Sequence, residues 1–301
     1  MIPITPDVRR RGRTPAVGTA NHHLVATTSG TTTPPVGIEV LMQLRVRPQI
    51  WIGIVVVIGY VTLVSIAQHL SGVPYPDLGD DGSTLFRGVG ISLVLGAIAL
   101  TVVTTLLGWW RPAMRDQHRA RSRWPVIAPV LMTVLMLLNL IGTDWGAYDL
   151  GFFAASLVLL LVGFTEEIAT RGLLVTALRS KLGEGWVWFL SSLVFGLMHY
   201  VNVLSGQDFG RTSFQVLSAF LFGTVLYILR RTTGTLVWSM VLHALWDFAV
   251  FATGKGHPAS FTGTGGLELL VGVFALIAVW WVIRGSDERL TDAPALSRQP
   301  R

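Results

Sequence analysis

Long apolar segments are the feature of this chain that most restricts its fold. A helix that crosses the roughly 30 Å hydrocarbon core of a bilayer needs about 20 apolar residues. Charged residues make up only 13% of the sequence, about half of their usual share in soluble domains. The pattern predicts an all-α, polytopic membrane helix bundle with about eight transmembrane helices. These segments lie at about 49–70, 88–110, 124–142, 151–178, 185–203, 212–229, 234–252 and 266–283.

The positive charges support this count and suggest an orientation. Lys and Arg total 23. If the N-terminus is cytoplasmic, all but four of them fall in cytoplasmic tails and loops. Arg87, Arg211 and Lys255 fall on the opposite side, and Arg171 lies inside a segment. Because positive residues collect on the cytoplasmic side of membrane proteins, both termini are predicted to be cytoplasmic. Membrane topology thus accounts for the basic charge, and nucleic acid is not an expected partner.

Three regions are expected along the chain. Residues 1–48 are rich in Thr, Pro, Gly and Arg without apolar periodicity, which predicts a disordered basic cytoplasmic tail. Residues 49–284 form the predicted membrane domain, and residues 285–301 a short cytoplasmic tail. The absence of cysteine excludes thiol catalysis and Cys-ligated metals. No internal repeat of the kind found in many transporters is present.

The fourth apolar segment carries three ionisable residues, Glu166, Glu167 and Arg171. Ionisable side chains inside a bilayer are costly and usually functional. Glu167 and Arg171 are four residues apart on a helix and are predicted to pair. Glu166 points about 100° away around the helix. It is therefore left without a local counter-charge, and must find another partner, bind water or take up a proton.

The fifth and seventh segments contribute His199, His243 and Asp247. The last two are four residues apart and share a helix face. Glu166 and His199 are equally far from the turn between their segments, so both are expected at the same depth, roughly 24 Å above it. The same estimate puts His243 about 8 Å lower. The three helices can then share one site only if the hairpin of the fourth and fifth segments protrudes into the cytoplasm.

These residue types suit hydrolysis. A carboxylate next to an imidazole can activate water as a general base. A second histidine with a polar neighbour can stabilise an oxyanion. The sequence lacks the His-Glu-x-x-His helix of many zinc proteases, and it has no serine or aspartyl protease motif. The constellation therefore favours peptide hydrolysis within the membrane by activated water.

Three motifs resemble those of the CPBP family of intramembrane proteases. They are Glu166-Glu167-Ile168-Ala169-Thr170-Arg171, Phe195 to His199, and His243 to Asp247. The family includes the CAAX prenyl endopeptidases, the Abi proteins and bacteriocin-processing or immunity proteins. The resemblance covers residues 151–252, the motif-bearing core. It implies a membrane-embedded endopeptidase that acts on a membrane-associated protein or peptide, located in the plasma membrane if the source is bacterial.

The resemblance also implies a role for each motif residue. Glu166 and His199 would activate the attacking water, and His243 with Asp247 would form the oxyanion side. The remaining pair, Glu167 and Arg171, would orient the site.

One position departs from the family pattern. The CAAX endopeptidase branch carries asparagine where this chain has Asp247. Asparagine donates hydrogen bonds, whereas an ionised aspartate only accepts them. Asp247 is therefore expected to accept from His243 and fix its tautomer or charge. This difference weakens the case for a prenylated CAAX protein as the substrate and leaves open whether prenylated proteins are cleaved.

The role of metal is open at this point. The family is often described as metalloproteases. If zinc is bound, Glu166, His199 and His243 are the expected ligands, as in His₂Glu sites. A glutamate-dependent mechanism without metal uses the same residues and is the one we expect.

Two other functions are compatible with the sequence. A non-catalytic membrane scaffold or immunity protein could keep the same fold, because fold does not fix function. A proton-coupled transporter could use intramembrane Glu and His as a proton relay.

Overall fold

The computed structural model describes residues 44–256, 264, 266–286 and 288–290. The chain divides into residues 1–34 and residues 35–301, and the described helices all belong to the second unit. Most of the predicted 1–48 tail lies outside the described residues. Within the described part the fold is all-helical, and its one backbone bridge joins Arg115 and Thr235.

Seven helical spans in the described part are long and apolar enough to cross a membrane. An eighth apolar helix, α14, has 17 residues. Each corresponds to one predicted segment. The first four spans are α2 (Ile50–Leu70), then α3 (Gly82–Leu85) with η2 (Phe86–Gly90) and α4 (Ile91–Leu107), then η3 (Trp124–Val126) with α6 (Ile127–Gly142), then α7 (Leu150–Ser156) through η5 (Leu157–Leu159), α8 (Leu160–Glu167) and η6 (Ile168–Leu174) to α9 (Val175–Leu178). The others are α10 (Glu184–Leu197) with η7 (Met198–Tyr200) and α11 (Val201–Leu204), then α12 (Phe209–Thr233), α13 (Val237–Gly256) and α14 (Leu267–Ile283).

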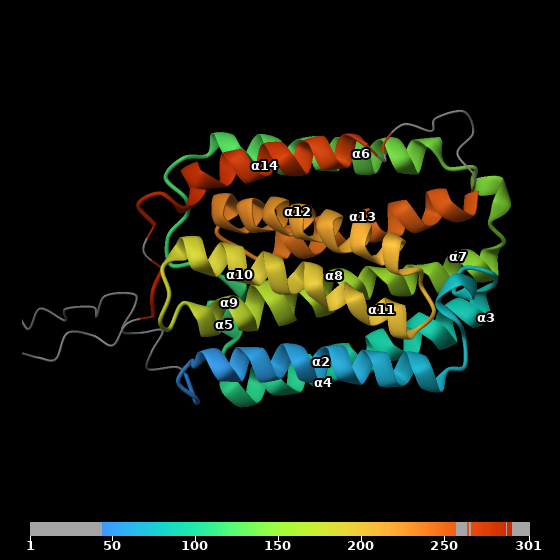
Figure 1. The fold of residues 1–301 in the computed structure, drawn as a ribbon, viewed down its shortest axis with the longest axis horizontal. Helices are drawn as coiled ribbons and strands as arrows, with labels where there is room; N and C mark the ends of the chain where they lie inside the picture. Colours follow the sequence, from blue (N-terminus) through green and yellow to red (C-terminus); the bar gives the residue numbers. More distant parts are fainter. Residues whose placement is uncertain (1–43, 257–263, 265, 287, 291–301) are drawn as a thin grey trace, which may run out of the picture. The chain divides into compact units, whose positions relative to one another are not determined.

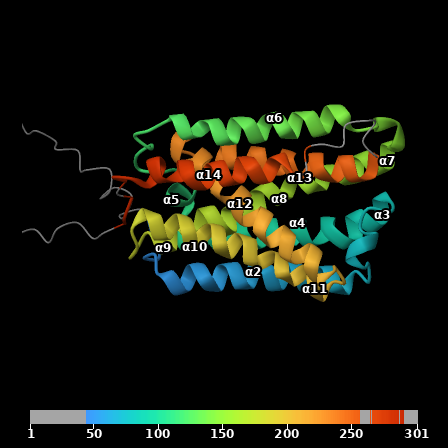
Figure 2. The same ribbon diagram turned by 45° about the horizontal axis from the view of Figure 1, so that its top comes forward.

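The spans run roughly parallel to one another in three groups (Figures 1 and 2). Helices α2 and α4 pack together along one side of the bundle, and α6 and α14 along the other. Helices α8, α10, α12 and α13 lie between these pairs, and α8 packs against α13 while α10 packs against α12. The ionisable motif residues lie in this central group, on α8 and α13 and on the short helices η6 and η7 that continue α8 and α10.

The outer helices show why this bundle belongs in lipid. Large apolar side chains on their outward faces are well exposed, including Ile58 on α2, Ile98 on α4, Ile141 on α6 and Ile277 on α14. In water such a surface would be an extensive apolar patch, whereas lipid solvates it. Helices satisfy their own backbone hydrogen bonds, so they can cross the apolar bilayer core. The chain is a multi-pass integral membrane protein.

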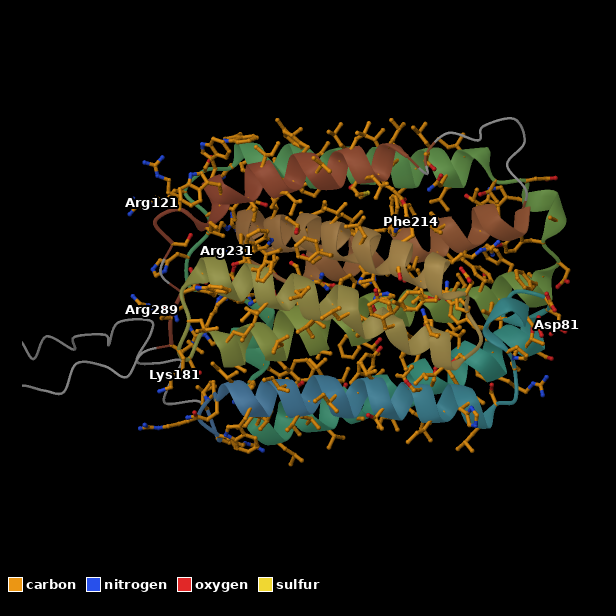
Figure 3. The ribbon with its side chains drawn as sticks, in the orientation of Figure 1. Asp81, Arg121, Lys181, Phe214, Arg231 and Arg289 are labelled. Carbon is orange, nitrogen blue, oxygen red and sulfur yellow. The ribbon has the colours of Figure 1, made fainter. Side chains whose placement is uncertain are left out.

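The two ends of the bundle differ in charge. Figure 3 shows Arg121, Lys181, Arg231 and Arg289 at one end and Asp81 at the other. We call the first the arginine end; it comprises the loops at 115–123, 179–183, 234–236, 284–286 and 288–290. The opposite end comprises the connections at 71–81, 143–149 and 205–208.

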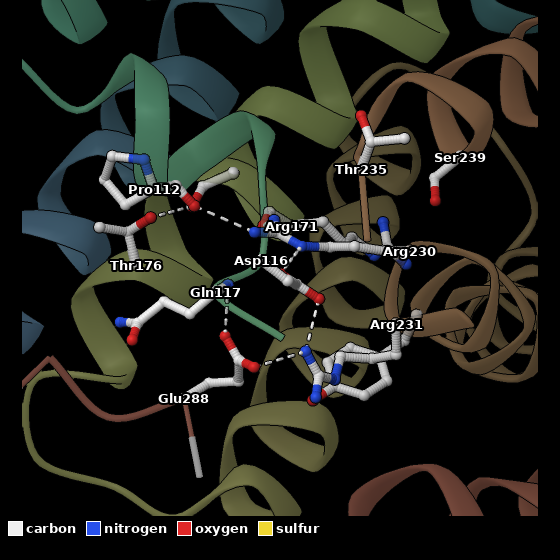
Figure 4. A network of polar contacts seen from close by, with 12 residues as sticks. Pro112, Asp116, Gln117, Arg171, Thr176, Arg230, Arg231, Thr235, Ser239 and Glu288 are labelled. Carbon is white, nitrogen blue, oxygen red and sulfur yellow. Dashed lines mark hydrogen bonds and ion pairs between the residues drawn. The ribbon is translucent and has the colours of Figure 1, made fainter. Parts of the chain in front are cut away.

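A buried ion-pair network holds the arginine end together (Figure 4). At its centre, Asp116 accepts hydrogen bonds from Arg179 (2.8 Å), Arg230 (2.9 Å) and Arg231 (2.6 Å). The sequence predicts that the sixth segment ends at residue 229, but α12 continues to Thr233, and Arg230 and Arg231 in its last turn are buried. Their charges are tolerated inside the protein because each one has a carboxylate partner.

The segment after α14 joins this network. Glu288 is buried, pairs with Arg231 at 3.2 Å, and accepts hydrogen bonds from the backbone N–H groups of Gln117 (2.8 Å) and His118 (2.9 Å). The Leu290 N–H donates to the carbonyl of Arg179. The described start of the predicted 285–301 tail is thus packed against the bundle.

The network fixes the charge state of Asp116. Burial alone would raise the pKa of this carboxyl, but the guanidinium groups of Arg179, Arg230 and Arg231 together hold its pKa well below the usual range. A depressed pKa gives stability that is present above the unfolded value of about 3.9. That stability is lost as the pH falls toward the folded value. Between pH 5 and 8 the contribution of Asp116 is therefore constant.

Replacing Asp116 by asparagine should destabilise the protein by about 3–5 kcal/mol, because three buried guanidinium groups lose their shared counter-charge. The measurement is the thermal unfolding midpoint in detergent micelles. Asp77→Asn is the matched control, since Asp77 is an exposed carboxylate. An unchanged midpoint in Asp116→Asn would show that the network is not a source of stability.

Candidate active site

The helix that carries the glutamates changes geometry at the site. Helix α8 ends at Glu167, and the next seven residues form the π-helix η6 (Ile168–Leu174), which is buried along its whole length. π-Helical turns are rare and often lie at functional sites. The apolar pattern of the sequence does not distinguish such a turn from an α-helix, so the sequence did not predict it.

Glu167 and Arg171 form the ion pair that their spacing predicts. Arg171 Nη1 lies 2.7 Å from Glu167 Oε1, and both side chains are fully buried. The Arg171 guanidinium also stacks on the Phe195 ring, 3.7 Å from its centroid. A Cβ atom at Gly223 of α12 would lie 2.5 Å from Arg171 Nη2, so glycine is what leaves room for the guanidinium. The pair therefore ties three helices together.

The same carboxylate oxygen of Glu167 also contacts His243 on α13. His243 Nδ1 lies 3.1 Å from Glu167 Oε1. Because a carboxylate only accepts, Nδ1 donates in this contact. The other ring nitrogen, Nε2, lies 3.8 Å from Glu166 Oε2 and 3.7 Å from Asp247 Oδ2. Glu167 thus turns the His243 ring so that Nε2 faces the other two carboxylates.

Glu166 differs from its neighbour. Among the described residues the Oε2 atoms of both glutamates are buried without a hydrogen-bond partner, but only Glu166 lines a cavity. The side chain is 17% exposed and lines a cavity of about 690 Å³. Leaving a buried carboxylate oxygen unpaired costs free energy. A water molecule in the cavity is the group that can satisfy it.

His199 lines the same cavity. Its Nδ1 lies 2.9 Å from the Phe195 carbonyl oxygen, which only accepts, so Nδ1 carries a proton. In the neutral ring, Nε2 is then the basic nitrogen. The Phe195 ring lies edge-to-face with both His199 and His243, with centroids 5.4 Å apart in each case. The Phe-x-x-x-His spacing of this chain thus places one aromatic ring against both histidines.

Close helix approaches bring these residues together. A Cβ atom at Gly163 of α8 would lie 2.2 Å from the Met240 carbonyl oxygen of α13, and one at Gly196 of α10 would lie 2.8 Å from that of Val216 in α12. Real Cβ atoms do not approach so closely. Glycine at these two positions, each within one helical turn of the motif residues, lets the helices pack at short distance.

The hairpin formed by the fourth and fifth segments protrudes, as a site shared by the three helices requires. Arg230, near the end of α12, donates to the backbone carbonyl of Arg171, which lies eight residues before Arg179 at the hairpin tip. The α9–α10 hairpin therefore extends beyond the α12–α13 turn, as Figures 1 and 2 also show. This offset lets His243 reach the level of Glu166.

Two cavities meet at the motif residues. The larger one is lined by Glu166, His199 and Asp247. A second cavity of about 430 Å³ is lined by His199, His243 and Asp247, and it is strongly aromatic. Gln215 also lines both cavities. The aromatic lining of the second cavity comes from Phe195, Phe214, Phe222, Trp246 and Phe251.

Three uncharged polar residues of the larger cavity escaped the sequence analysis. Asn202 Nδ2 donates to Gln215 Oε1 at 3.1 Å and lies 3.5 Å from the Tyr75 hydroxyl. These side chains are uncharged, so the pattern of intramembrane charges does not indicate them. A usable signal was available, because Asn202 follows His199 by three residues, which puts both on one helix face.

The described residues do not form a metal site. No group of three or more His, Asp or Glu side chains among them converges closely enough to hold a metal ion. Glu166, His199 and His243, the ligands expected if zinc is bound, therefore do not fit zinc in this arrangement. The metal-free mechanism stays a prediction.

The comparison with known families fits this geometry. Residues 148–249, about a third of the chain, match the family model described as type II CAAX prenyl endopeptidase Rce1-like. The match spans α7 to α13 and contains every ionisable motif residue. It confirms the resemblance to the CPBP proteases that the three motifs indicated. No curated protein and no solved structure gives a match to this chain.

Replacement by glutamine should change the stability of the protein by very different amounts at the two adjacent glutamates. Glu167→Gln leaves the Arg171 guanidinium buried without a counter-charge and should cost about 3–5 kcal/mol of stability. Glu166→Gln breaks no hydrogen bond at Oε2, whose nearest charge partner is His243 Nε2 at 3.8 Å, and should change stability by less than about 1 kcal/mol. Thermal unfolding of both variants in the same detergent checks this. A larger loss in Glu166→Gln would contradict the assignment of the ion pair.

Proposed function

We propose that the protein is an intramembrane endopeptidase in which Glu166 and His199 activate a water molecule. The observation that carries this proposal is the unpaired Glu166 carboxylate oxygen, buried at a cavity that His199 also lines. A buried carboxylate of this kind can take a proton from water while the water attacks a carbonyl carbon. The match to an endopeptidase family supports a peptide bond as the target.

In this mechanism the imidazole rings of His199 and His243 have different roles, because they are oriented differently. His199 presents Nε2 as an acceptor, since Nδ1 is engaged with the Phe195 carbonyl. It can therefore orient the same water by accepting its second hydrogen. His243 has Nδ1 engaged with Glu167, and its Nε2 faces Glu166 and Asp247. These carboxylates balance the charge of an imidazolium, which donates from Nε2 to the developing oxyanion.

Asp247 does not donate to the oxyanion when ionised. It acts instead on His243, by favouring the protonated ring from 3.7 Å away. We assign the second oxyanion donor to the Gln215 amide, which lies where the two cavities meet, beside His199 and Asp247. Its oxygen accepts from Asn202, so the amide group is oriented. Two N–H groups remain, and the neighbouring Tyr75 hydroxyl can take at most one.

The decisive test is a comparison of cleavage products. Wild type and Glu166→Gln are expressed at matched levels, and the N-terminal peptides of the membrane proteome are compared. We expect termini that appear only with wild type, because glutamine cannot accept the proton from water. Identical profiles from two folded proteins would favour a scaffold without catalysis, the alternative compatible with the same fold.

Loss of the Gln215 donor should reduce turnover. Gln215→Ala should lower kcat by about 10²–10³-fold with little change in KM, the usual effect of removing one oxyanion donor. The assay uses a quenched fluorescent peptide built on a wild-type-dependent cleavage site. Gln68→Ala is the control, since Gln68 lines the larger cavity but not its junction with the second. Equal rates for the two variants would contradict the donor assignment.

Removal of metal should leave cleavage unchanged. The purified protein is dialysed against a chelator, and both its cleavage rate and its metal content are measured. One equivalent of zinc in wild type that is lost together with activity in Glu166→Gln would overturn the metal-free mechanism.

A further inference from the structure

The larger cavity leads away from the arginine end. Beyond Glu166 and His199 its lining continues to Tyr75, Leu78 and Gly79 in the connection after α2, and to Gly254 near the end of α13. These residues adjoin the opposite end of the bundle, where Figure 3 labels Asp81. The cavity of about 690 Å³ thus connects the candidate active site with the region near that end.

The other direction is closed by packed side chains. Between the glutamates and the arginine end, Ile168, Arg171 and Leu173 are fully buried, and Leu174 is nearly so. The ion-pair network around Asp116 follows. A small cavity of about 100 Å³ lies at that end, but none of the proposed catalytic residues lines it.

The charge difference between the two ends suggests how the bundle is inserted. Positive side chains crowd the arginine end, whereas the opposite end carries Arg87 and Arg211 among the described basic side chains. The positive-inside rule places the arginine end in the cytoplasm. The cavity would then open on the extracytoplasmic side.

The lining of the two cavities adds information on the substrate. Their described charged side chains include the carboxylates of Glu166, Asp247 and Glu268, and no Lys or Arg is among them. A peptide with a free C-terminal carboxylate in this space would meet like charge, which is costly in a low-dielectric site. The one cation of the proposed mechanism, the His243 imidazolium, is already balanced by Glu166, Glu167 and Asp247. An internal or positively charged peptide segment is compatible with it.

We infer that the catalytic cavity opens to the extracytoplasmic side and takes internal segments of exported or outer-leaflet polypeptides, not the C-termini of cytoplasmic proteins. The substrate class rests on the proposed endopeptidase function. The direction of the opening depends only on the cavity and the charge of the two ends.

The natural absence of cysteine allows a direct test. Single-cysteine variants are made at Gly254 and Val64 along the cavity and at Lys181 of the arginine end. A Cβ atom at Gly254 has open space around it, and Lys181 is exposed. Intact cells are treated with a small, membrane-impermeant cationic methanethiosulfonate, and labelling is compared with that after permeabilisation.

We expect Gly254→Cys and Val64→Cys to label in intact cells, at rates at least tenfold above that of Lys181→Cys. Lys181→Cys should label only after permeabilisation. The reverse pattern, or cavity cysteines that stay unlabelled until the cells are opened, would overturn the inference. Labelling requires no cleavage and should be the same in a Glu166→Gln background. The experiment can therefore contradict the extracytoplasmic opening of the cavity without bearing on the proposed endopeptidase activity, and the reverse also holds.

The cleavage sites supply the test of the substrate class. Wild-type-dependent termini should map to extracytoplasmic segments at least three residues from the original C-terminus and without an acidic residue next to the cleaved bond. Sites that remove the last three residues of cytoplasmic proteins would overturn the substrate class even if the labelling pattern holds.

Discussion

One carboxylate oxygen, Glu167 Oε1, organises the centre of this bundle. It accepts from Arg171 at 2.7 Å and from His243 at 3.1 Å, and all three side chains are buried. The cost of burying these charges is met only while all the contacts are kept. Helix α8 is thereby joined to α13, and through the stacking of Arg171 on Phe195 it is joined to α10. Glu166, the next residue along the chain, is turned toward the cavity instead.

The two ends of the molecule follow from the same requirement that buried charge be paired. At the arginine end, Asp116, Glu184 and Glu288 balance Arg179, Arg230 and Arg231, and the packed network closes the bundle there. In the middle, Glu166 has no arginine or lysine partner among the described residues; its nearest charge partner is His243 Nε2 at 3.8 Å, and it faces a cavity. The carboxylates of the arginine end form close ion pairs with arginines, as a structural site does, whereas Glu166 lies at a cavity without an arginine beside it, as a candidate catalytic residue does.

The sequence predicted the all-α class, the position of every span and the Glu167–Arg171 pair, because apolar length and i,i+4 spacing are local properties. It did not predict the network at the arginine end. Asp116 and Glu288 lie more than a hundred residues apart, and nothing in their local sequence brings them together. The π-helical turn after Glu167 was missed because an apolar pattern does not distinguish it from an α-helix, and the Asn202–Gln215 contact because it joins two different helices. The roles of Glu166, His199, His243 and Asp247 remain predictions.

The most direct test of this account separates the structural and chemical uses of Glu167. In the double variant Glu167→Met/Arg171→Met the buried charges are removed together, which usually restores the stability lost when one partner is removed. His243, however, loses its acceptor. We predict that the double variant unfolds at a temperature close to that of wild type but cleaves the wild-type-dependent sites at least 10²-fold more slowly. Cleavage at the wild-type rate would contradict the claim that this carboxylate positions His243 for chemistry.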